Sequence, residues 1–590
     1  MKRTLPRLLA TLLCLALLFA MAACGAPDNT QSTPVSDSGS ASTEPVQTAD
    51  TSTPTYGGTM TMYYHEFYNY YDPAMPTSYS YAFWLEGLWA MDWDSDYAYN
   101  NDYWTYENVD GQIADTWEIA EDYSSLTVHL REDVYFQSKE DAQYDIFGGR
   151  QLMASDVKYT YDRILGLGSG WDEPVECEMN WPSELYMVES VETDGDFTVI
   201  FHFNTTTEVA LNTFMTTVVN ITGPEWDELT ADQQGDWHYA VGTGPFILTN
   251  VSVGSSMSFT RNDSYYDYDE RNPENKLPYL DGVELVHIDD SANLLSQFTA
   301  GTIDWIGSTS AVFNSSELAQ LRATVPEDSY TEYTYNTNPP AEISLKCNQE
   351  PFNDVRVRKA LQMAINCDEI YHSYYGLEGE VIIPGIWATD LTNYSAVADW
   401  SDELKAEYSY DPEGARALLA EAGYPDGFTF TVALAPNADT DLYVLVGTYL
   451  ADIGVTMEIE QCAEIMETIS ISSNPDDTRQ VSGMHGGKGA IAIIKMTTTS
   501  AGANYTYNHG NQAYEDAVTG FEQAQTLDEQ SQYAKEMDLI FAQEHWGIAL
   551  GGYTQLNEFM SNKIHGYDGQ KLTVNQYRRT VVARLWMDAE

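Results

Sequence analysis

Hydrophobic and polar residues alternate along the chain with two distinct periods. Every second position from Phe197 to Phe203 is a large apolar residue, and the same holds from Leu126 to Leu130. A period of two is typical of a β-strand that buries one face and leaves the other more polar. Both segments are therefore predicted to be strands of a sheet that packs on one side.

Other segments carry apolar residues at the spacing of a helix. Ser155 precedes apolar residues at 157, 161, 164 and 165, which predicts a helix with Ser155 as its N-cap. A second helix is predicted to start at Asp411, with Pro412 in its first turn, and a third at Asn353 or Asp354. Strands and helices are interspersed throughout, which predicts an α/β fold and disfavours all-α and all-β folds.

The first 55 residues do not fit this pattern. Cations at Lys2, Arg3 and Arg7 precede an apolar run from Leu8 to Ala20, followed by small residues and Cys24. Small residues before a cysteine resemble a bacterial lipobox, which predicts a signal peptide over 1–23 and lipid on Cys24. An ordinary signal peptide is the alternative. Residues 24–55 are rich in Ser, Thr and Pro, which predicts a disordered tether that spans roughly 30 Å as a coil.

Charge and cysteine content exclude several classes of function. The 590 residues include 27 Lys and Arg against 90 Asp and Glu, a formal charge of −63. Such a field repels nucleic acid and anionic lipid headgroups. Four cysteines remain beyond the tether, far apart and without C-x-x-C spacing, and we interpret them as free and mostly buried thiols rather than a metal site or a disulfide framework. They are Cys177, Cys347, Cys367 and Cys462.

Familiar catalytic motifs are absent from the sequence. There is no G-x-S-x-G motif and no H-E-x-x-H motif. The glycine-rich run from Gly483 to Gly489 lacks the spacing and the hydroxyl residue of a phosphate-binding loop. Ninety carboxylates could supply the acid and the nucleophile of a glycosidase. A secreted glycosidase therefore stays open as an alternative function.

A series of short motifs occurs in a fixed order along the chain. They are Tyr56-Gly57-Gly58-Thr59-Met60, Asp72-Pro73-Ala74, Ile113 to Glu118, Leu126 to Phe136, Ala154 to Val157 with Tyr161, Gly242 to Phe246, Gly301 to Asp304, Pro351 to Leu361, and Asp411 to Pro425. Together they resemble the bacterial extracellular solute-binding proteins of the oligopeptide/dipeptide type (solute-binding protein family 5), the receptors of ABC importers. The resemblance runs from about Tyr56 to the C-terminus.

This resemblance implies a two-lobed, periplasmic-binding-protein-like α/β fold of type II, with an extra subdomain and a hinge between the lobes. Lobe I is expected to comprise residues 56–91, 235–340 and 552–590, the extra subdomain residues 92–234, and lobe II residues 341–551. A small solute would be captured in the cleft between the lobes and delivered to an ABC permease, without catalysis and without a cofactor. The protein would be a monomer, held by its lipid on the outer face of the cell membrane.

The resemblance also places candidate ligand-binding residues on segments that face the cleft in relatives. These are Glu66, Phe67, Tyr68, Asn348, Met484, His485 and Gly486. A structural role competes with ligand contact at each: Tyr68 could be a packed core aromatic, and Glu66 could lie on a solvated face. No residue is expected to be catalytic or to bind a metal.

Two of the motifs have a physical interpretation of their own. Gly242-Thr243-Gly244-Pro245 predicts a sharp reversal between lobes with glycines at positive φ, rather than a ligand loop. Arg356, Arg358 and Lys359 place three cations in the first turns of a helix, where the helix dipole disfavours them. We expect local carboxylates, rather than a ligand, to pair with these cations.

The chain departs from the family in two places that concern the ligand. Peptide-binding relatives carry a W-x-x-D-Y-like stretch whose Asp can meet the amino group of the ligand, whereas this chain has Val481 to Lys488 there, without Trp or Asp. Asn366-Cys367-Asp368 stands where relatives usually show D-R. Peptides are the default solute, oligosaccharides the alternative because tyrosine and tryptophan faces stack on sugar rings, and metal chelates come third, without support from the histidine pattern.

Overall fold

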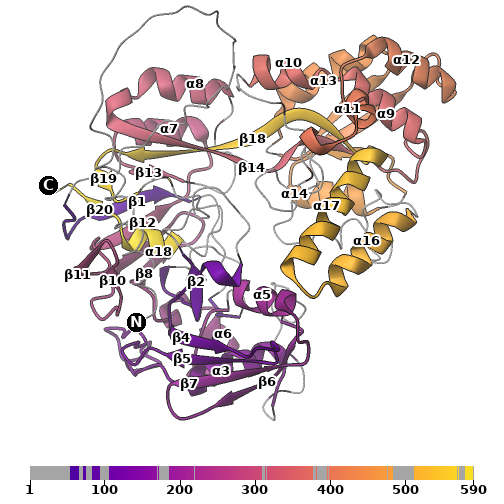
Figure 1. The fold of residues 1–590 in the computed structure, drawn as a ribbon. Coiled ribbons are helices and arrows are strands. Elements are labelled where there is room, and N and C mark those ends of the chain that lie inside the picture. The colour runs from indigo at the N-terminus through magenta and orange to yellow at the C-terminus, as the bar shows by residue number, and fades with distance from the viewer. Residues whose placement is uncertain are drawn as a thin grey trace, which may run out of the picture. The chain divides into compact units, whose positions relative to one another are not determined.

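A ten-stranded mixed sheet organises the computed structural model of the chain (Figure 1). The structure describes residues 53–64, 71–74, 83–92, 105–168, 171, 174, 185–217, 219–307, 313, 315–375, 381, 395, 397–436, 438–474, 476–482, 511–567, 569 and 578–588. The strand order is β16-β15-β17-β14-β18-β13-β1-β12-β9-β8. The strands are β1 (Thr59–Tyr63), β8 (Phe246–Ser252), β9 (Ser256–Arg261), β12 (Gly282–Val286), β13 (Trp305–Ile306), β14 (Tyr330–Ser344), β15 (Thr429–Leu434), β16 (Thr456–Gln461), β17 (Gln480–Ser482) and β18 (Gly547–Ser561).

Two long antiparallel strands, β14 and β18, form a ribbon through the middle of this sheet. The ribbon pairs Tyr330 with Ser561 at one end and Ser344 with Gly547 at the other. At the first end β1, β12 and β13 run parallel to one another, and at the second end β15, β16 and β17 do. We call the two halves lobe I and lobe II. In the described part of the chain, β14 leads from lobe I to lobe II and β18 leads back (Figure 1).

A separate four-stranded antiparallel sheet, β4-β5-β7-β6, forms the core of a third region, which we call the subdomain. Its strands are β4 (Ala114–Ile119), β5 (Ser125–Leu130), β6 (Val188–Thr193) and β7 (Thr198–Phe203), and its helices are α3 (Ala154–Leu165) and α5 (Glu208–Thr216). Along β5 and β7 alternate residues are buried, among them Val128, Val199 and Phe201. The predicted strands are thus confirmed, and their buried faces pack with Tyr161 of α3.

The remaining helices lie mostly in lobe II. They are α6 (Ala231–Gln234), α7 (Ser291–Thr299), α8 (Ser315–Thr324), α9 (Val355–Ala364), α10 (Cys367–Glu369), α11 (Asp402–Glu407), α12 (Pro412–Glu421), α13 (Thr440–Asp452), α14 (Ile465–Ser473), α16 (Gln512–Gln523), α17 (Leu527–Glu544) and α18 (Arg578–Ala583). Short strands form three further pairs: β2 (Trp89–Met91) with β3 (Val109–Gly111), β10 (Tyr268–Asp269) with β11 (Asn272–Lys276), and β19 (Ile564–His565) with β20 (Trp586–Met587).

Two of the three predicted helix starts are confirmed. The Asp411 carboxylate accepts from Gly414 N at 2.9 Å at the start of α12, and the Asp354 side chain caps α9. The predicted cap of α3 is wrong, because the helix already begins at Ala154 and its N-cap is Met153. The carboxylate of Asp156 reaches back to Met153 N at 2.9 Å, so the helix start is fixed from its third residue.

The glycines of the G-T-G-P motif serve a different purpose from the one expected. Neither Gly242 nor Gly244 has a positive φ. A Cβ atom at Gly242 would instead lie 2.0 Å from the carbonyl oxygen of Trp84, and Gly244 N donates to that oxygen at 3.0 Å. The motif therefore lets two backbone segments run side by side, and glycine is required for lack of space rather than for its dihedral freedom.

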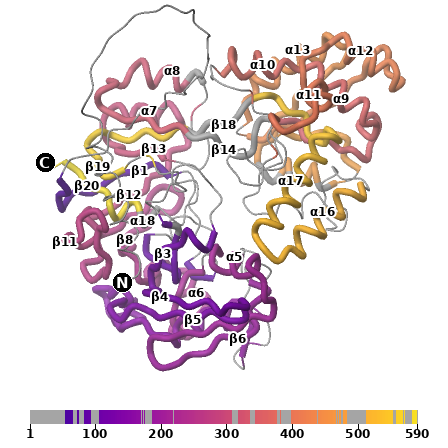
Figure 2. The backbone as a smooth tube through the Cα atoms, viewed as in Figure 1, coloured from indigo at the N-terminus to yellow at the C-terminus, as the bar shows by residue number. Residues whose placement is uncertain are grey.

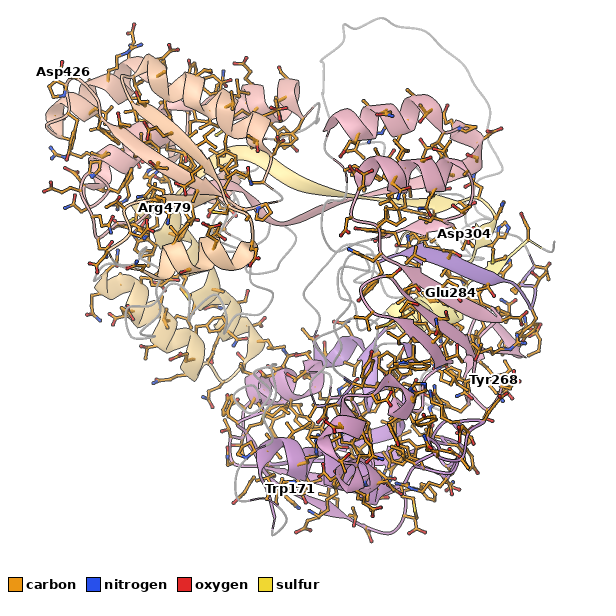
Figure 3. All side chains as sticks on the ribbon, turned by 180° about the vertical axis from the view of Figure 1, so that it is seen from behind. Trp171, Tyr268, Glu284, Asp304, Asp426 and Arg479 are labelled. Atoms are coloured by element: carbon orange, nitrogen blue, oxygen red, sulfur yellow. The ribbon has the colours of Figure 1, made fainter. Side chains whose placement is uncertain are left out.

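The G-x-I-D motif fixes the centre of lobe I. Asp304, labelled in Figure 3, accepts from Thr61 N at 2.9 Å through its carboxylate, and its own N–H donates to Thr61 O at 2.7 Å. Its carbonyl oxygen accepts from Ser561 N at 2.7 Å. One aspartate thus links β1 to the end of β18.

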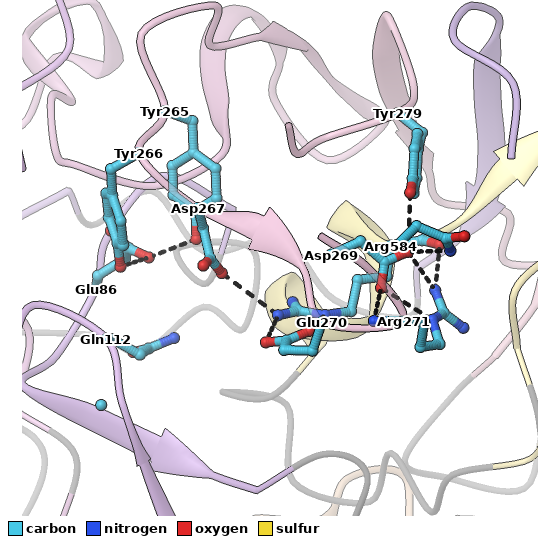
Figure 4. Close-up of polar contacts among 12 residues, drawn as sticks. Glu86, Gln112, Tyr265, Tyr266, Asp267, Asp269, Glu270, Arg271, Tyr279 and Arg584 are labelled. Carbon is cyan, nitrogen blue, oxygen red and sulfur yellow. Dashed lines mark hydrogen bonds and ion pairs between the residues drawn. The ribbon is translucent and has the colours of Figure 1, made fainter. Parts of the chain in front are cut away.

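The last described segment closes lobe I against much earlier parts of the chain. Thr55 Oγ1 donates to Met587 O at 2.7 Å, so the first and last described segments lie side by side (Figure 2). Arg584, which is 2% exposed, pairs with Asp267 at 3.3 Å and with Glu270 (Figure 4). Arg271 donates to Arg584 O at 3.1 Å. This network ties the C-terminal segment to the β10–β11 hairpin.

Candidate functional site

The parallel strands of the two lobes point toward one another along the ribbon. β13 is antiparallel to β18, which starts in lobe II and ends in lobe I, so β13 and its parallel neighbour β1 point toward lobe II. β17 is antiparallel to β14, which runs the other way, so β17 and β15 point toward lobe I. In α/β sheets, ligands bind outside the carboxyl ends of parallel strands. The candidate site is therefore formed by the residues at these two facing edges.

The edge of lobe I carries aromatic and titratable side chains. Tyr63 ends β1, and its ring stacks on His287 with centroids 6.4 Å apart. His287 lies directly after β12, with Nδ1 3.0 Å from Tyr64 O and Nε2 2.9 Å from a carboxylate oxygen of Asp289. Burial, and to a lesser degree Asp289, raises the pKa of Tyr63. The hydroxyl of Tyr63 therefore stays protonated and can serve as a hydrogen-bond donor.

The edge of lobe II carries a cluster of buried polar residues that come from three segments, β14, α13 and β17. Glu342 and Ser344 belong to β14, are 1% and 3% exposed, and join through Ser344 Oγ, which donates to Glu342 Oε1 at 2.5 Å. The hydroxyl of Tyr443 on α13 donates to Glu342 O at 2.7 Å. Ser482, the last residue of β17, accepts from Ala435 N at 2.9 Å through its hydroxyl and also bonds to Tyr443. Burial, with Glu342 adding to it, raises the pKa of Tyr443 well above its usual value.

A tyrosine–carboxylate pair lies beside this group. The hydroxyl of Tyr374 is 3.0 Å from both carboxylate oxygens of Asp439. Asp439 is also the N-cap of α13 and accepts from Leu442 N at 3.3 Å. The carboxylate thus joins the start of α13 to Tyr374.

Asn348 is the one predicted ligand-binding residue that lies among the described residues. It follows the buried Leu345-Lys346-Cys347 segment after β14, and its Oδ1 atom is buried without a hydrogen-bond partner among the described residues. Such an atom costs free energy unless a partner is supplied. Its neighbour Gln349 donates to Asp477 O at 3.0 Å, ahead of β17, so Asn348 lies toward the start of that strand and not at the edge where β17 ends. The ligand contact expected for Asn348 stays a prediction.

The other predicted contacts lie outside the described residues. In the sequence, Glu66, Phe67 and Tyr68 come shortly after Tyr64, with His65 between. Met484, His485 and Gly486 come shortly after Ser482, with Gly483 between. Cys24 and Cys177 also lie outside them. The structure thus describes the strands β1 and β17, which precede the two stretches of candidates in the sequence. The ligand contacts of the candidates themselves stay predictions.

The sequence argument missed Glu342, Tyr443 and Ser482. A signal for the first was present, because Glu342, Ser344 and Lys346 alternate with Ile343 and Leu345 in a strand pattern. Polar residues on a strand whose both faces are buried are a reason to suspect a site. Tyr443 and Ser482 carry no such local signal, since they reach Glu342 only through the tertiary fold.

The three cations of α9 are paired within the protein, as expected. Arg356 pairs with Asp354 at 2.6 Å, Arg358 pairs with Glu544 at 3.2 Å, and Lys359 pairs with Glu407. Arg358 also donates to Phe352 O at 2.8 Å. These pairs lie in the helical layer of lobe II and leave none of the three cations in need of a ligand.

Cysteines and possible metal ligands add nothing to the site. Cys347, Cys367 and Cys462 are free and buried, as predicted. Burial raises the pKa of the thiols of Cys347 and Cys367 to about 12, which makes them unreactive. Within the described ranges, no group of three or more His, Cys, Asp and Glu side chains is arranged to hold a metal ion. Of the described helices, none is long and apolar enough to cross a bilayer.

Comparison with known sequences points to one family. Residues 108–512 match the family described as bacterial extracellular solute-binding proteins, family 5. The chain is 26% identical over 340 residues to heme-binding protein A of Haemophilus influenzae, which covers 54% of this chain and 55% of that protein. It is 25% identical over 334 residues to di/tripeptide-binding protein 3 of Pseudomonas aeruginosa, covering 55% and 57%. The match thus spans just over half the length of these curated relatives.

Comparison with solved structures shows the same fold over nearly the whole chain. The periplasmic binding protein DppA from Helicobacter pylori, solved in complex with the peptide STSA, superposes with a TM-score of 0.66 at 19% identity. The superposition covers 91% of this chain and 99% of that one. The two-lobed α/β fold expected from the sequence is therefore confirmed.

Proposed function

Because the chain belongs to family 5 of the bacterial extracellular solute-binding proteins, we propose that it is the solute receptor of an ABC importer. It captures a small solute between its lobes and delivers it to the permease in the membrane. The observation that carries this proposal is the direction of the strands. The carboxyl ends of β1 and β13 in lobe I and of β15 and β17 in lobe II point toward one another along the β14–β18 ribbon.

The proposed mechanism is closure about the ribbon. A solute that contacts both edges favours the state in which the edges are close together, and the population shifts toward that state. Among the described side chains at the edges, Tyr63 provides a hydroxyl donor in lobe I, and the group of Glu342, Ser344 and Ser482 provides polar atoms in lobe II. None of this requires a covalent step, so we propose a binding protein that is monomeric, uses no cofactor and has no enzymatic activity.

We propose a peptide as the solute and an oligosaccharide as the alternative. Support comes from the relatives that are themselves named for di- and tripeptides or solved with a peptide. The heme-binding relative shows that family resemblance alone does not fix the solute. The stretch after β17 offers donors, His485 and Lys488, in place of an aspartate. It therefore favours ligands rich in acceptors, such as carbonyls, hydroxyls or a carboxylate.

Calorimetry with matched ligands tests the identity of the solute. A peptide and its N-acetylated form should bind with similar affinity, because no anionic pocket for an amine is expected in the stretch from Met484 to Lys488. If acetylation weakens binding a hundredfold, about 2.7 kcal/mol, that expectation is wrong. If only an oligosaccharide binds, the peptide proposal gives way to the sugar alternative. Hydrolysis of the oligosaccharide during incubation would instead show a glycosidase.

We propose that Glu66, Phe67 and Tyr68 line the solute from lobe I, and that Asn348 and the Met484-His485-Gly486 stretch line it from lobe II. Asn348→Ala removes the unpaired oxygen and should weaken solute binding without loss of stability. The matched control is Asn562→Ala, at the far end of the ribbon, where the amide donates to Asp328 O at 3.0 Å. Equal affinities of the two variants would remove Asn348 from the site.

The domain assignment is also a proposal. Lobe I comprises residues 56–91, 235–340 and 552–590, the extra subdomain residues 92–234, and lobe II residues 341–551. In support, β14 and β18 carry the chain between the halves of the sheet near residues 341 and 551. Limited proteolysis that cuts preferentially near these residues, rather than within the lobes, would be the expected result.

We further propose that Cys24 carries a diacylglyceryl anchor on the outer face of the cell membrane, and that residues 24–55 tether the receptor to it. The support is the lipobox-like sequence before Cys24 and the polar composition after it. Two acyl chains anchor a protein stably, whereas one is reversible. Cys24→Ala should therefore abolish labelling with palmitate and release the protein from the membrane fraction. Identical partitioning of both forms would contradict the anchor.

A further inference from the structure

The subdomain contacts lobe II through elements other than the ribbon. Glu208 is the first residue of α5, and its N–H donates to Gln525 O at 3.1 Å. Its carboxylate oxygen Oε2 accepts from Leu527 N at 3.1 Å. Gln525 and Leu527 flank the N-cap of α17, in the turn after α16. Two hydrogen bonds from a single residue thus join an element of the subdomain to an element of lobe II.

The subdomain holds Glu208 from the other side. The hydroxyl of Tyr106 donates to Glu208 Oε1 at 3.1 Å, and Tyr106 N donates to Asn212 Oδ1 of the same helix at 2.9 Å. Burial raises the pKa of Tyr186, which also belongs to the subdomain, and the charge of Glu522 on α16 adds to this. The hydrogen bonds of the contact itself join Glu208 to two backbone groups of lobe II, Gln525 O and Leu527 N.

The charge of Glu208 suits its position. Leu527 is the first residue of an eighteen-residue helix, whose N-terminus carries unpaired N–H groups and a partial positive charge. A carboxylate there makes a charge-assisted hydrogen bond, which is stronger than one between neutral groups. The helix α17 itself is anchored in lobe II, because Phe541 and Met537 lie in the core of that lobe.

We propose that Glu208 is a latch that holds the subdomain of lobe I against lobe II in the solute-free receptor. The proposal rests on the closing mechanism proposed above, in which the ribbon alone leaves the lobes free to separate. A latch of this kind raises the fraction of molecules in the binding-competent state, and the apparent affinity for any solute rises by the same factor. Its strength is set by the chain's own residues and does not depend on which solute binds.

The test measures the lobe separation without any solute. Spin labels at Thr193→Cys on β6 and Glu536→Cys on α17, in the full-length chain with Cys14→Ser, Cys24→Ser and Cys177→Ser, report a distance distribution by double electron–electron resonance. Both label positions are exposed. Glu208→Ala should lower the ratio of the short-distance to the long-distance population about tenfold, the equivalent of 1.4 kcal/mol.

A second variant breaks the same bond from the opposite side. Leu527→Pro removes the N–H that donates to Glu208, and proline is well tolerated at the first position of a helix. Thr526 before it has φ −125° and ψ 158°, which suits a residue that precedes proline. The double variant should show no more separation than either single one, because both remove one interaction.

The control is Glu413→Gln, an exposed glutamate in the first turn of α12, which should give the wild-type distances. Unchanged distributions in both Glu208→Ala and Leu527→Pro would overturn the latch. A change in Leu527→Pro alone would also overturn it, because it would show an effect on α17 rather than on the contact. Since no solute is present, failure here leaves the proposed function to be judged by calorimetry.

Discussion

At the scale of single residues, the buried ammonium of Lys346 holds the segment between α14 and β17 in place. Its side chain is part of a residue that is 2% exposed, and Nζ donates to Ile471 O at 2.6 Å, Asn474 O at 2.9 Å and Asp477 O at 2.8 Å. Burial lowers the pKa of Lys346. All three protons of the ammonium are thus used to fasten the end of α14 and the turn before β17.

Lys346→Met should therefore destabilise the protein strongly. The substitution keeps the length of the side chain but leaves three carbonyl groups without their donor, that of Ile471 in a buried position, a loss of about 3 kcal/mol. Urea unfolding measures it. Lys405→Met is the matched control, since among the described residues that ammonium donates only to Ala398 O, at 2.8 Å, and its loss should cost less than about 1 kcal/mol. Equal losses in the two variants would contradict this account of Lys346.

His545 should make the stability of the protein depend on pH. It ends α17 in a left-handed conformation, is 0% exposed and has Nε2 3.0 Å from Glu407, while Lys359 and Arg358 lie nearby. Burial lowers the pKa of His545 below its ordinary value of 6.5, and the two cations add to this, although Glu407 opposes it. The unfolded chain therefore binds more protons than the folded one, so stability falls as the pH drops through 6.5 and levels off below the folded pKa.

The measurement is the urea midpoint as a function of pH. His545→Asn removes the titrating group and keeps a side chain that tolerates the left-handed conformation. The difference between the wild-type and variant curves isolates the histidine from the many carboxylates. That difference should change in the neutral to mildly acidic range and be flat above it. A difference that stays constant over the whole pH range would show that burial does not lower the pKa of His545.

At the scale of elements, the ribbon contains an irregularity that depends on one glycine. β14 pairs Pro340 with Tyr553 and Glu342 with Ala549, so three residues of β18 lie opposite a single residue of β14. Gly551, in the middle of the three, has φ +71°. A Cβ atom there would lie 2.6 Å from the carbonyl oxygen of Cys367. The bulge thus brings β18 against α10, and both its dihedral and its spacing require glycine.

Gly551→Ala is expected to cost about 3 kcal/mol, from the left-handed dihedral and the overpacking together. Gly254→Ala is the matched control, because Gly254 has φ +69° but no atom within 4 Å of an added Cβ. It should show the dihedral cost alone, about 1 kcal/mol. Urea unfolding of the two variants separates the cost of the left-handed dihedral from the cost of overpacking. Equal losses of unfolding free energy in the two variants would argue against the close approach to Cys367.

The sequence pattern correctly predicts the elements that are determined by interactions between residues close together in the sequence. The buried face of β7 and the caps at Asp354 and Asp411 follow from spacing and from one side chain each. The cap of α3 was misassigned because Ser155 has the better residue type while Asp156 makes the bond. The expectation of positive φ at the glycines of the G-T-G-P segment was wrong for a different reason. These glycines are required by the close approach of Trp84, which is distant in sequence and is brought near only by the tertiary fold. The group of Glu342, Tyr443 and Ser482 could not be assembled from sequence for the same reason.

At the scale of the whole molecule, the proposed function implies that a bound solute should make the protein more compact and more resistant to heat. A ligand that binds the folded state at one hundred times its Kd stabilises it by about 2.7 kcal/mol. Small-angle scattering should show a smaller radius of gyration with the solute identified by calorimetry. A compound that calorimetry shows not to bind is the control. A tight solute that raises the melting temperature but leaves the scattering curve unchanged would contradict closure.

The path of the chain through the ribbon also determines the order in which the lobes can be completed as the chain is synthesised. All described strands of lobe II lie between β14 and β18, so that lobe can fold as soon as this stretch has emerged from the ribosome. Lobe I begins to emerge first, yet β13 must wait for β18, and Asp267 and Glu270 must wait for Arg584. The lobe synthesised first is therefore the last to be finished, and until then the unpaired edge of β13 is exposed to pairing with other chains.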